Sequence, residues 1–141
     1  MILAQGAEAI LTREGMIVIK HRIQKKYRLE VLDSVLRRSR QRREAKVIMR
    51  LEEAGVPVPH VLESDEKDMK LGMDFINGPK VRDVMDAEPK KYGAAVGALL
   101  AKMHEVGIAH GDPTTSNFIA GDNVHVIDFG LSFFTKKIED Y

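Results

Sequence analysis

The sequence predicts an α+β fold in two lobes that share a cleft, and three observations lead to this prediction. The chain of 141 residues is long enough for one domain with a real core, or for two small lobes. Strand-like runs and one long helix occupy its first half, whereas an amphipathic helix and polar loops occupy its second half. Acidic and amide side chains gather in those last loops, and a strand of the first half ends in a lysine. We expect an N-terminal lobe over residues 1–76 and a C-terminal lobe over residues 77–141.

Composition excludes several classes of protein. Apolar residues form 44% of the chain and charged residues 30%, which is typical of a globular protein and not of a disordered one. No apolar run approaches the roughly 20 residues that a membrane-spanning helix needs, and the N-terminus lacks the pattern of a secretory signal. The absence of cysteine excludes disulfides and thiolate metal sites. We expect a cytoplasmic protein that has no association with a membrane.

Two short strands over residues 3–11 are predicted to open the chain, with a turn around Gly6 between them. Glycine permits a tight turn there, and the neighbouring amides could approach phosphates, although a simple β-turn is the alternative. After a turn at residues 12–15, residues 16–20 form a strand that ends in Lys20. Two apolar residues followed by lysine are typical of the strand whose lysine reaches nucleotide phosphates. An ordinary lysine at a strand end is the alternative.

A long helix is predicted from residue 29 or 34 to residue 54, where a glycine and two prolines end it. Glu44 is the acid in the basic part of this helix. A helical glutamate that pairs with the strand lysine would hold its ammonium group in place, so Glu44 is the predicted partner of Lys20. The alternative is an ion pair between Glu44 and Arg40, one helical turn away.

The same helix carries five arginines within seven residues, from Arg37 to Arg43. Residues 20–50 contain twelve Lys or Arg against three acids, whereas residues 51–90 contain five bases against ten acids. Such a run is usually a solvated helix face, but this one extends over more than one face. It therefore indicates a phosphate-rich partner or a neighbouring acidic protein surface.

The middle of the chain predicts two paired strands, over residues 58–63 and 70–75, and then a break. If the two lobes join where the chain leaves the second strand, as in kinases, main-chain atoms of Asp74 and Ile76 are candidates to hold an adenine base. Without that context, a strand followed by a loop is the alternative. Pro89 then suits the first turn of a helix whose apolar residues recur at helical spacing as far as Met103.

The most informative stretch is residues 110–117, which read His-Gly-Asp-Pro-Thr-Thr-Ser-Asn, together with the Asp-Phe-Gly triplet at residues 128–130. An Asp, an Asn five positions on and a second Asp form the acidic end of a kinase-type phosphoryl-transfer site. Asp112 is suited to orient an attacking hydroxyl and to accept its proton. Asn117 and Asp128 supply the oxygen ligands that Mg²⁺ prefers. A turn and a hairpin with incidental carboxylates are the alternative.

A hairpin is predicted between these two motifs, with strands over residues 118–120 and 124–127. It places Asn117 just before one strand and Asp128 just after the other. Both side chains can therefore converge on one metal ion.

The chain resembles the small atypical protein kinases of the KEOPS (EKC) tRNA-modification complex, which are relatives of the RIO kinases. The residues that carry this resemblance are 5–9, Lys20, 27–28, 42–45, 111–117 and 127–132. The resemblance implies a two-lobed protein-kinase-like fold with a minimal C-terminal lobe, or one that is cut short. It also implies ATP and Mg²⁺ as cofactors. The implied cofactor contacts are Gln5, Gly6, Ala7, Glu8, Lys20, Glu44, Asp74, Ile76, Asn117 and Asp128.

The resemblance further implies Ser/Thr autokinase and ATPase activity in support of threonylcarbamoyladenosine formation on tRNA. The implied partners are the catalytic subunit that makes this modification and a small regulatory subunit of the complex. A small-molecule phosphotransferase is one alternative, because such enzymes use a similar His-Gly-Asp loop. A non-catalytic assembly or tRNA-binding subunit is another.

Three departures from ordinary protein kinases bear on the mechanism. Gly111 stands where an arginine usually binds an activation-loop phosphate, so no such switch is expected. Thr114 replaces a lysine that would neutralise the γ-phosphate. No Ala-Pro-Glu motif follows Asp128-Phe129-Gly130, so a platform for peptide substrates is missing and weak protein kinase activity is expected.

Overall fold

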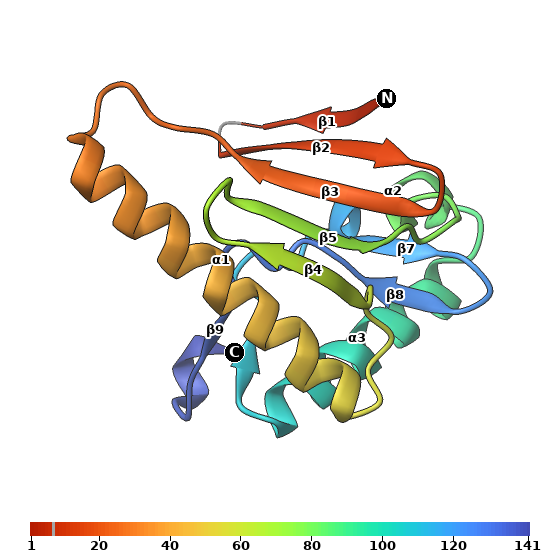
Figure 1. Cartoon of the computed structure of the whole chain (residues 1–141). Helices are drawn as coiled ribbons and strands as arrows, with labels where there is room; N and C mark the ends of the chain where they lie inside the picture. The colour runs from red at the N-terminus through yellow and green to blue at the C-terminus, as the bar shows by residue number, and fades with distance from the viewer. Residues whose placement is uncertain (7) are drawn as a thin grey trace.

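A five-stranded antiparallel sheet dominates the first half of the computed structural model, which describes residues 1–6 and 8–141. Its strands lie in the order β1-β2-β3-β5-β4 (Figure 1). Their bounds are β1 (Ile2–Gln5), β2 (Ala9–Glu14), β3 (Ile17–Arg22), β4 (Val61–Asp65) and β5 (Lys70–Asp74). Strand β2 continues as far as Glu14, so the turn before β3 is shorter than residues 12–15. The strand β3 is paired on both sides, which fixes its side chains firmly.

The helix α1 (Glu30–Glu53) lies across the sheet and extends beyond it at its N-terminal end (Figure 1). It ends where Gly55 adopts a φ of 80° and the amide of Val56 donates to the carbonyl of Leu51. Its buried side chains form a single face, which consists of Asp33, Gln41, Glu44, Val47, Ile48 and Leu51. Among the residues described, no helix is long and apolar enough to cross a membrane.

The second half of the chain consists of short elements around one helix. In chain order they are α2 (Val81–Val84), α3 (Pro89–Glu105), β6 (Ile108–Ala109), the 3₁₀ turn η1 (Thr115–Asn117), β7 (Phe118–Ala120), β8 (Val124–Val126), β9 (Phe133–Phe134) and η2 (Ile138–Asp140). The strands β7 and β8 form the predicted hairpin, and β6 pairs with β9. The sequence did not predict α2, because four residues are too few to show a helical period.

One hydrophobic core joins the two halves. Val47, Ile48 and Leu51 of α1 belong to the same buried cluster as Met103 of α3 and Phe118 of β7. Burial of side chains of this size supplies most of the driving force for folding. The elements that carry the candidate site residues are therefore fixed to a common core. The division into two lobes at residue 76 stays a prediction.

Candidate active site

Four buried or half-buried charged side chains from three segments meet beneath the sheet. Lys20 Nζ lies 3.0 Å from Glu44 Oε1 and 3.1 Å from Asp128 Oδ1. Arg22 Nη2 donates to the other carboxylate oxygen of Glu44. Successive residues of a strand alternate between its faces, so Lys20 and Arg22 point the same way from β3. The predicted ion pair between Lys20 and Glu44 is present, and Arg40 is not part of it.

The charges in this cluster stabilise one another. Burial disfavours the charged amine of Lys20, but Glu44 and Asp128 outweigh this effect and raise its pKa. Burial also disfavours a charged Glu44, yet Lys20 and Arg22 together hold the pKa of that carboxyl below its usual range. The pKa of Asp128 is lowered in the same way, against burial, by Lys20 and by the amide of Gly130. All three side chains are consequently charged near neutral pH.

The Asp128-Phe129-Gly130 segment is held by its backbone as well as by its side chains. Asp128 has a φ of 57°, in the left-handed region that few residues other than glycine and asparagine adopt. The amide of Phe129 donates to Glu44 Oε1 over 3.3 Å, and the Phe129 ring is 1% exposed in the core. Glu44 therefore links α1, β3 and this segment, which turns the Asp128 carboxylate toward Lys20.

Asp112 and Asn117 are joined within the loop that precedes β7. The Asn117 amide nitrogen donates to the Asp112 carbonyl over 2.8 Å and to its carboxylate over 3.2 Å. The Asn117 carbonyl accepts from the amide of Ile127, next to Asp128. The Asp112 side chain remains exposed, and the side-chain oxygen of Asn117 has no hydrogen-bond partner among the residues described. The loop thus presents an exposed carboxylate, which accepts one hydrogen bond from Asn117, next to an amide oxygen.

His110 organises this loop from a buried position. Its Nε2 lies 3.0 Å from the Ile127 carbonyl, and its Nδ1 accepts from the Asp112 amide over 3.2 Å. Because Nδ1 accepts a hydrogen bond, Nε2 is the nitrogen that donates to the Ile127 carbonyl. His110 therefore fixes the backbone on either side of the candidate site.

The backbone conformation and the surroundings of Gly111 explain why no arginine stands at this position. It has a φ of 86°, and a Cβ placed on it would lie 2.1 Å from the carbonyl oxygen of Leu131. Neither the backbone conformation nor the space allows a larger side chain. The absence of a larger side chain at Gly111 is thus a steric requirement of the contact between the loop at residues 110–117 and the chain after Gly130.

A cavity of about 280 Å³ lies next to the charged cluster. Lys20, Glu44 and Asp128 line one part of it. The remaining wall is mainly apolar and comes from several strands, with Leu3, Ala4, Leu11, Val18, Met73, Ile76, Ile119 and Ile127 among its residues. An apolar cleft with a few convergent charged groups is the usual form of a small-molecule site.

The predicted adenine contacts lie on this wall, whereas the predicted phosphate turn does not. Asp74 and Ile76 both line the cavity, but the amide of Asp74 already donates to the carbonyl of His60. The amide of Gly6 donates to the carbonyl of Ala9. Glu8 is held by Arg40, whose guanidinium lies 2.9 Å from its carboxylate. Leu3 and Ala4 of β1 line the cavity from this part of the chain, and Gln5, Gly6 and Glu8 do not. The predicted contact at Ala7 lies outside the described residues.

Sequence reasoning missed Arg22, although a signal for it was available. The residue is 4% exposed and shares Glu44 with Lys20. Its position two residues after Lys20 on a strand places it on the same face, which period-two alternation would have indicated.

The donor set suits a magnesium ion bound together with a nucleotide. Asn117 and Asp128 offer oxygen atoms, and Lys20 offers a fixed positive charge. Within residues 1–6 and 8–141 no group of three or more His, Cys, Asp or Glu side chains could hold a metal by itself. Mg²⁺ characteristically uses one or two carboxylates and completes its shell with phosphate and water. These residues therefore fit Mg²⁺ with a nucleotide, and the same set lacks the nitrogen or sulfur ligands that zinc prefers.

Comparison with known proteins places the chain in a family. The RIO domain family matches residues 14–137. The protein named EKC/KEOPS complex subunit BUD32 from Encephalitozoon cuniculi is 38% identical over 138 residues, which cover 96% of this chain and 69% of that protein. KEOPS complex subunit Bud32 from Pyrococcus abyssi is 39% identical over 142 residues, covering 97% and 64%. The chain belongs to the Bud32 family of RIO-domain proteins.

Two further similarities extend this result. A Methanococcus maripaludis protein named probable bifunctional tRNA threonylcarbamoyladenosine biosynthesis protein is 34% identical over 143 residues, which cover 99% of this chain and 26% of that protein. The Rio2 kinase of Chaetomium thermophilum superposes with a TM-score of 0.81 at 18% identity, covering 99% of this chain and 49% of that one. The resemblance and the minimal kinase-like fold predicted from the sequence are confirmed.

Proposed function

We propose that this chain binds ATP with Mg²⁺ in the cavity and transfers or hydrolyses the γ-phosphoryl group, as an atypical Ser/Thr kinase and ATPase. The observation that supports this most strongly is the meeting of Lys20, Glu44 and Asp128 on one wall of an apolar cavity. The described chain covers roughly two thirds of its Bud32 relatives, so the activity of the whole protein belongs to this proposal. The Rio2 kinase neighbour was crystallised with ADP and Mg²⁺, which is consistent with these cofactors.

Each residue has a distinct role in this proposal. Lys20 contacts the nucleotide phosphates, and Glu44 holds the Lys20 ammonium in place. Asn117 and Asp128 hold Mg²⁺, which supplies electrostatic stabilisation of the charge that develops on the phosphate oxygens. Asp112 orients the attacking hydroxyl or water and accepts its proton. Main-chain atoms at Asp74 and Ile76 contact the base. The Asp74 amide is already engaged by His60, whereas the Ile76 amide has no backbone partner among the residues described, so the Ile76 amide and the Asp74 carbonyl are the proposed contacts.

Two substitutions test this function. Asp112→Ala is expected to leave ATP binding intact and to lower turnover by about 10²- to 10⁴-fold, because a general base is removed from an exposed loop. Asp128→Ala is expected to abolish the Mg²⁺-dependent part of nucleotide affinity. Asp122→Ala, in the exposed turn between β7 and β8, is the matched control and should change neither quantity. Undiminished turnover in Asp112→Ala would contradict the catalytic role.

We also propose that the activity supports threonylcarbamoyladenosine modification of tRNA within the KEOPS complex, in the cytoplasm. The names of the Bud32 relatives and of the bifunctional proteins support this placement. The predicted partners are the catalytic subunit that makes the modification and a small regulatory subunit. ATP turnover measured with and without the purified catalytic subunit tests the proposal, and an unchanged rate together with no detectable association would contradict it.

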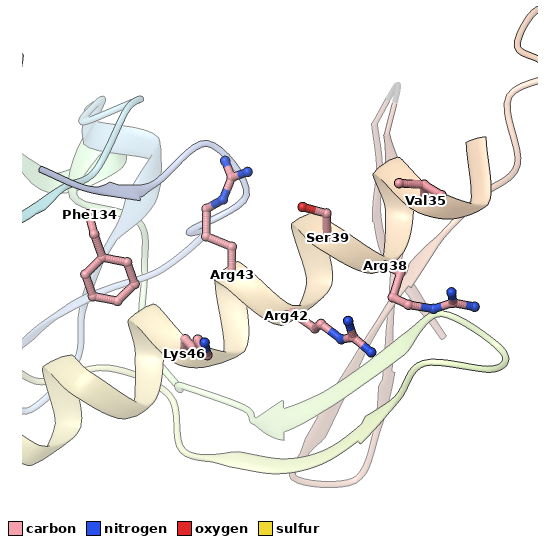
Figure 2. A pocket seen from close by; sticks show the side chains of 7 residues that line it. All are labelled: Val35, Arg38, Ser39, Arg42, Arg43, Lys46 and Phe134. Carbon is pink, nitrogen blue, oxygen red and sulfur yellow. The ribbon is translucent and has the colours of Figure 1, made fainter. Parts of the chain in front are cut away.

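The arginine run supports a separate contact with tRNA, although three of its members are engaged within the chain. Arg37 is bound to Asp33 at 2.7 Å, Arg40 to Glu8 and Arg42 to Glu66. Arg38 and Arg43 have no ion-pair partner among the residues described. They line a groove of about 470 Å³ with Lys46 and Phe134, shown in Figure 2. Cations beside an exposed aromatic ring suit a phosphate backbone with an unstacked base.

A binding experiment tests this contact apart from the enzyme activity. Arg38→Ala and Arg43→Ala are each expected to lower the affinity for tRNA and to reduce the slope of log affinity against log salt by about one. Lys90→Ala, an exposed cation at the start of α3, is the control and should leave the slope unchanged. Identical slopes in all four proteins would exclude the groove as an RNA contact.

A further inference from the structure

Arg22 occupies a position that the phosphoryl-transfer chemistry itself does not require. It ends β3, is 4% exposed and does not line the cavity. Its backbone amide donates to the Met69 carbonyl at 3.0 Å, and its carbonyl accepts from Arg37 Nη1 at 3.3 Å. The backbone of Arg22 is thereby held between the sheet and α1. The guanidinium is fixed in place before any ligand arrives.

The carboxylate of Glu44 is divided between two cations. Lys20 takes Oε1, and Arg22 takes Oε2. The Phe129 amide shares Oε1, so the same carboxylate also holds the segment that carries Asp128. With two cations and two anions, the group of Lys20, Arg22, Glu44 and Asp128 carries a formal charge of zero. Without Arg22 the same group would carry one excess negative charge.

This division matters because the proposed function requires Lys20 to make a third contact. Its amine contacts both Glu44 and Asp128, and in the proposed function it must also contact nucleotide phosphates. A lysine that turned toward the phosphates as the only partner of Glu44 would weaken the neutralisation of a carboxylate that is 1% exposed. A buried charge without a partner is strongly unfavourable. With Arg22 on Oε2, Glu44 stays neutralised when Lys20 moves.

We propose that Arg22 is a positioning residue, which holds Glu44 and the Asp128-Phe129-Gly130 segment in the arrangement for phosphoryl transfer independently of Lys20 and of nucleotide. This role rests on the proposed function for its catalytic meaning, but the anchoring is a property of the nucleotide-free protein. The active arrangement is then already present in the folded chain. This agrees with the glycine at position 111, where other kinases have an arginine that binds an activating phosphate.

A second feature distinguishes a positioning role of Arg22 from a contribution to fold stability alone. Arg22 Nη1 is buried and has no hydrogen-bond partner among the residues described. An unsatisfied buried donor is unfavourable for stability, so a side chain selected for stability alone would not leave one. Replacement by methionine removes that donor and keeps the stem volume, while Lys20 still neutralises Glu44. Arg22→Met should therefore fold, with its defect confined to the position of Glu44.

Hydrogen exchange on the nucleotide-free chain tests the anchoring directly. Amide protection is measured for residues 44–51 and 127–132 in the wild type, Lys20→Met, Arg22→Met and the double variant. We expect Lys20→Met to keep protection within about threefold of wild type because Arg22 still holds Glu44, and the double variant to lose about tenfold or more. Equal loss in Lys20→Met and in the double variant would overturn the proposal. Arg22→Lys, which keeps the charge, should restore part of the protection in the Lys20→Met background.

Enzyme kinetics give an independent reading. Arg22→Met is expected to lower kcat by about ten- to a hundredfold with the KM for ATP little changed, because orientation is lost and nucleotide contacts are kept. A raised KM at unchanged kcat would make Arg22 a nucleotide-binding group and would overturn the proposal. If the wild type does not turn over ATP, the proposed function fails, and the exchange experiment still decides whether Arg22 anchors Glu44.

Discussion

The two faces of α1 carry polar and charged side chains in opposite circumstances. On the inner face Asp33, Gln41 and Glu44 are completely or almost completely buried. Each makes at least two hydrogen bonds to other segments. On the outer face Arg43 and Lys46 are exposed, and they line an open groove with Phe134 (Figure 2). One helix therefore separates charges that fix geometry from charges that face solvent.

The difference between the two faces follows from burial. A buried charge must be paired and hydrogen-bonded, so its partners are determined by the fold. An exposed charge is hydrated and needs no partner, so it is available to another molecule. The first kind should control stability and catalysis, and the second should control binding. The substitutions below test whether the two faces can be separated in this way.

The largest effect is expected from removing the shared carboxylate of the inner face. Glu44→Ala leaves Lys20 and Arg22 as buried cations that have lost their common partner. The free energy of unfolding should fall by about 3–5 kcal/mol, as for other broken buried ion pairs. Urea unfolding measures it, and Glu53→Ala, at the exposed end of the same helix, is the control, with a change below about 0.5 kcal/mol. Equal losses in the two variants would remove the distinction between the faces.

Acid should weaken the inner face in a defined range of pH. The folded pKa values of Glu44 and Asp128 lie below their unfolded values, which are about 4. Their stabilisation is therefore fully present above about pH 5 and is lost as the pH falls through the folded pKa values. The pKa of Lys20 is raised, so its contribution is lost only in strong alkali. Denaturant midpoints from pH 7 to pH 3 should decline only at the acidic end.

A pair of variants assigns this acid sensitivity to the cluster. Glu44→Gln cannot gain a proton, so the decline of its stability between pH 5 and pH 3 should be shallower than in the wild type. Arg43→Gln changes a charge on the outer face and keeps both carboxylates, so its decline should parallel that of the wild type. Parallel declines in all three proteins would show that the acid sensitivity arises elsewhere.

A smaller loss is expected at Gln41, which attaches the inner face to the β4–β5 hairpin. Its amide nitrogen donates to Ser64 Oγ at 3.2 Å and to the carbonyls of Asp65 and Lys70 at 3.0 and 3.3 Å. Gln41→Leu keeps the volume but leaves these acceptors without the donor, at a cost of about 1–3 kcal/mol. Ser64→Ala removes only one acceptor and should cost less. A neutral Gln41→Leu would mean that water replaces the lost donor.

The sequence predicted those parts of the site whose spacing is set by chemistry. Asp112, Asn117 and Asp128 were named because a magnesium-phosphate chemistry would fix their types and separations, and their roles stay predictions. Glu44 was recognised because a strand lysine needs a helical acid. In each case the local pattern and the required function restrict the same residue, so no knowledge of distant contacts was needed.

Contacts that depend on how distant segments approach were not predictable from the pattern. Arg40 is one helical turn from Glu44, but the turn after β1 brings Glu8 to it. Arg42 is bound by Glu66 from the β4–β5 turn, so the arginine run is divided between the interior, other loops and solvent. Helical spacing specifies a face, and only tertiary packing determines which segment covers it.

The smallest effect, and the sharpest comparison, concerns the neighbours Arg42 and Arg43. Arg42 makes two hydrogen bonds to Glu66, at 2.6 and 2.7 Å, whereas Arg43 has no partner among the residues described. Arg42 lines the groove beside Arg43, and its pairing with Glu66 lowers the positive charge there, so Glu66→Gln should leave the Arg42 guanidinium available to RNA. We expect a slightly higher affinity for tRNA and a salt slope steeper by up to about one.

The stability of the fold should not follow this change in binding. Arg42 is 60% and Glu66 35% exposed in their side chains, and an exposed pair of this kind contributes little to folding. The unfolding midpoint of Glu66→Gln should therefore stay close to that of the wild type while RNA binding strengthens. Arg43→Ala in the same background should remove part of the gain. If Glu66→Gln weakens RNA binding instead, the Arg42–Glu66 pair shapes the groove, and the outer face would then resemble the inner face in depending on paired charges.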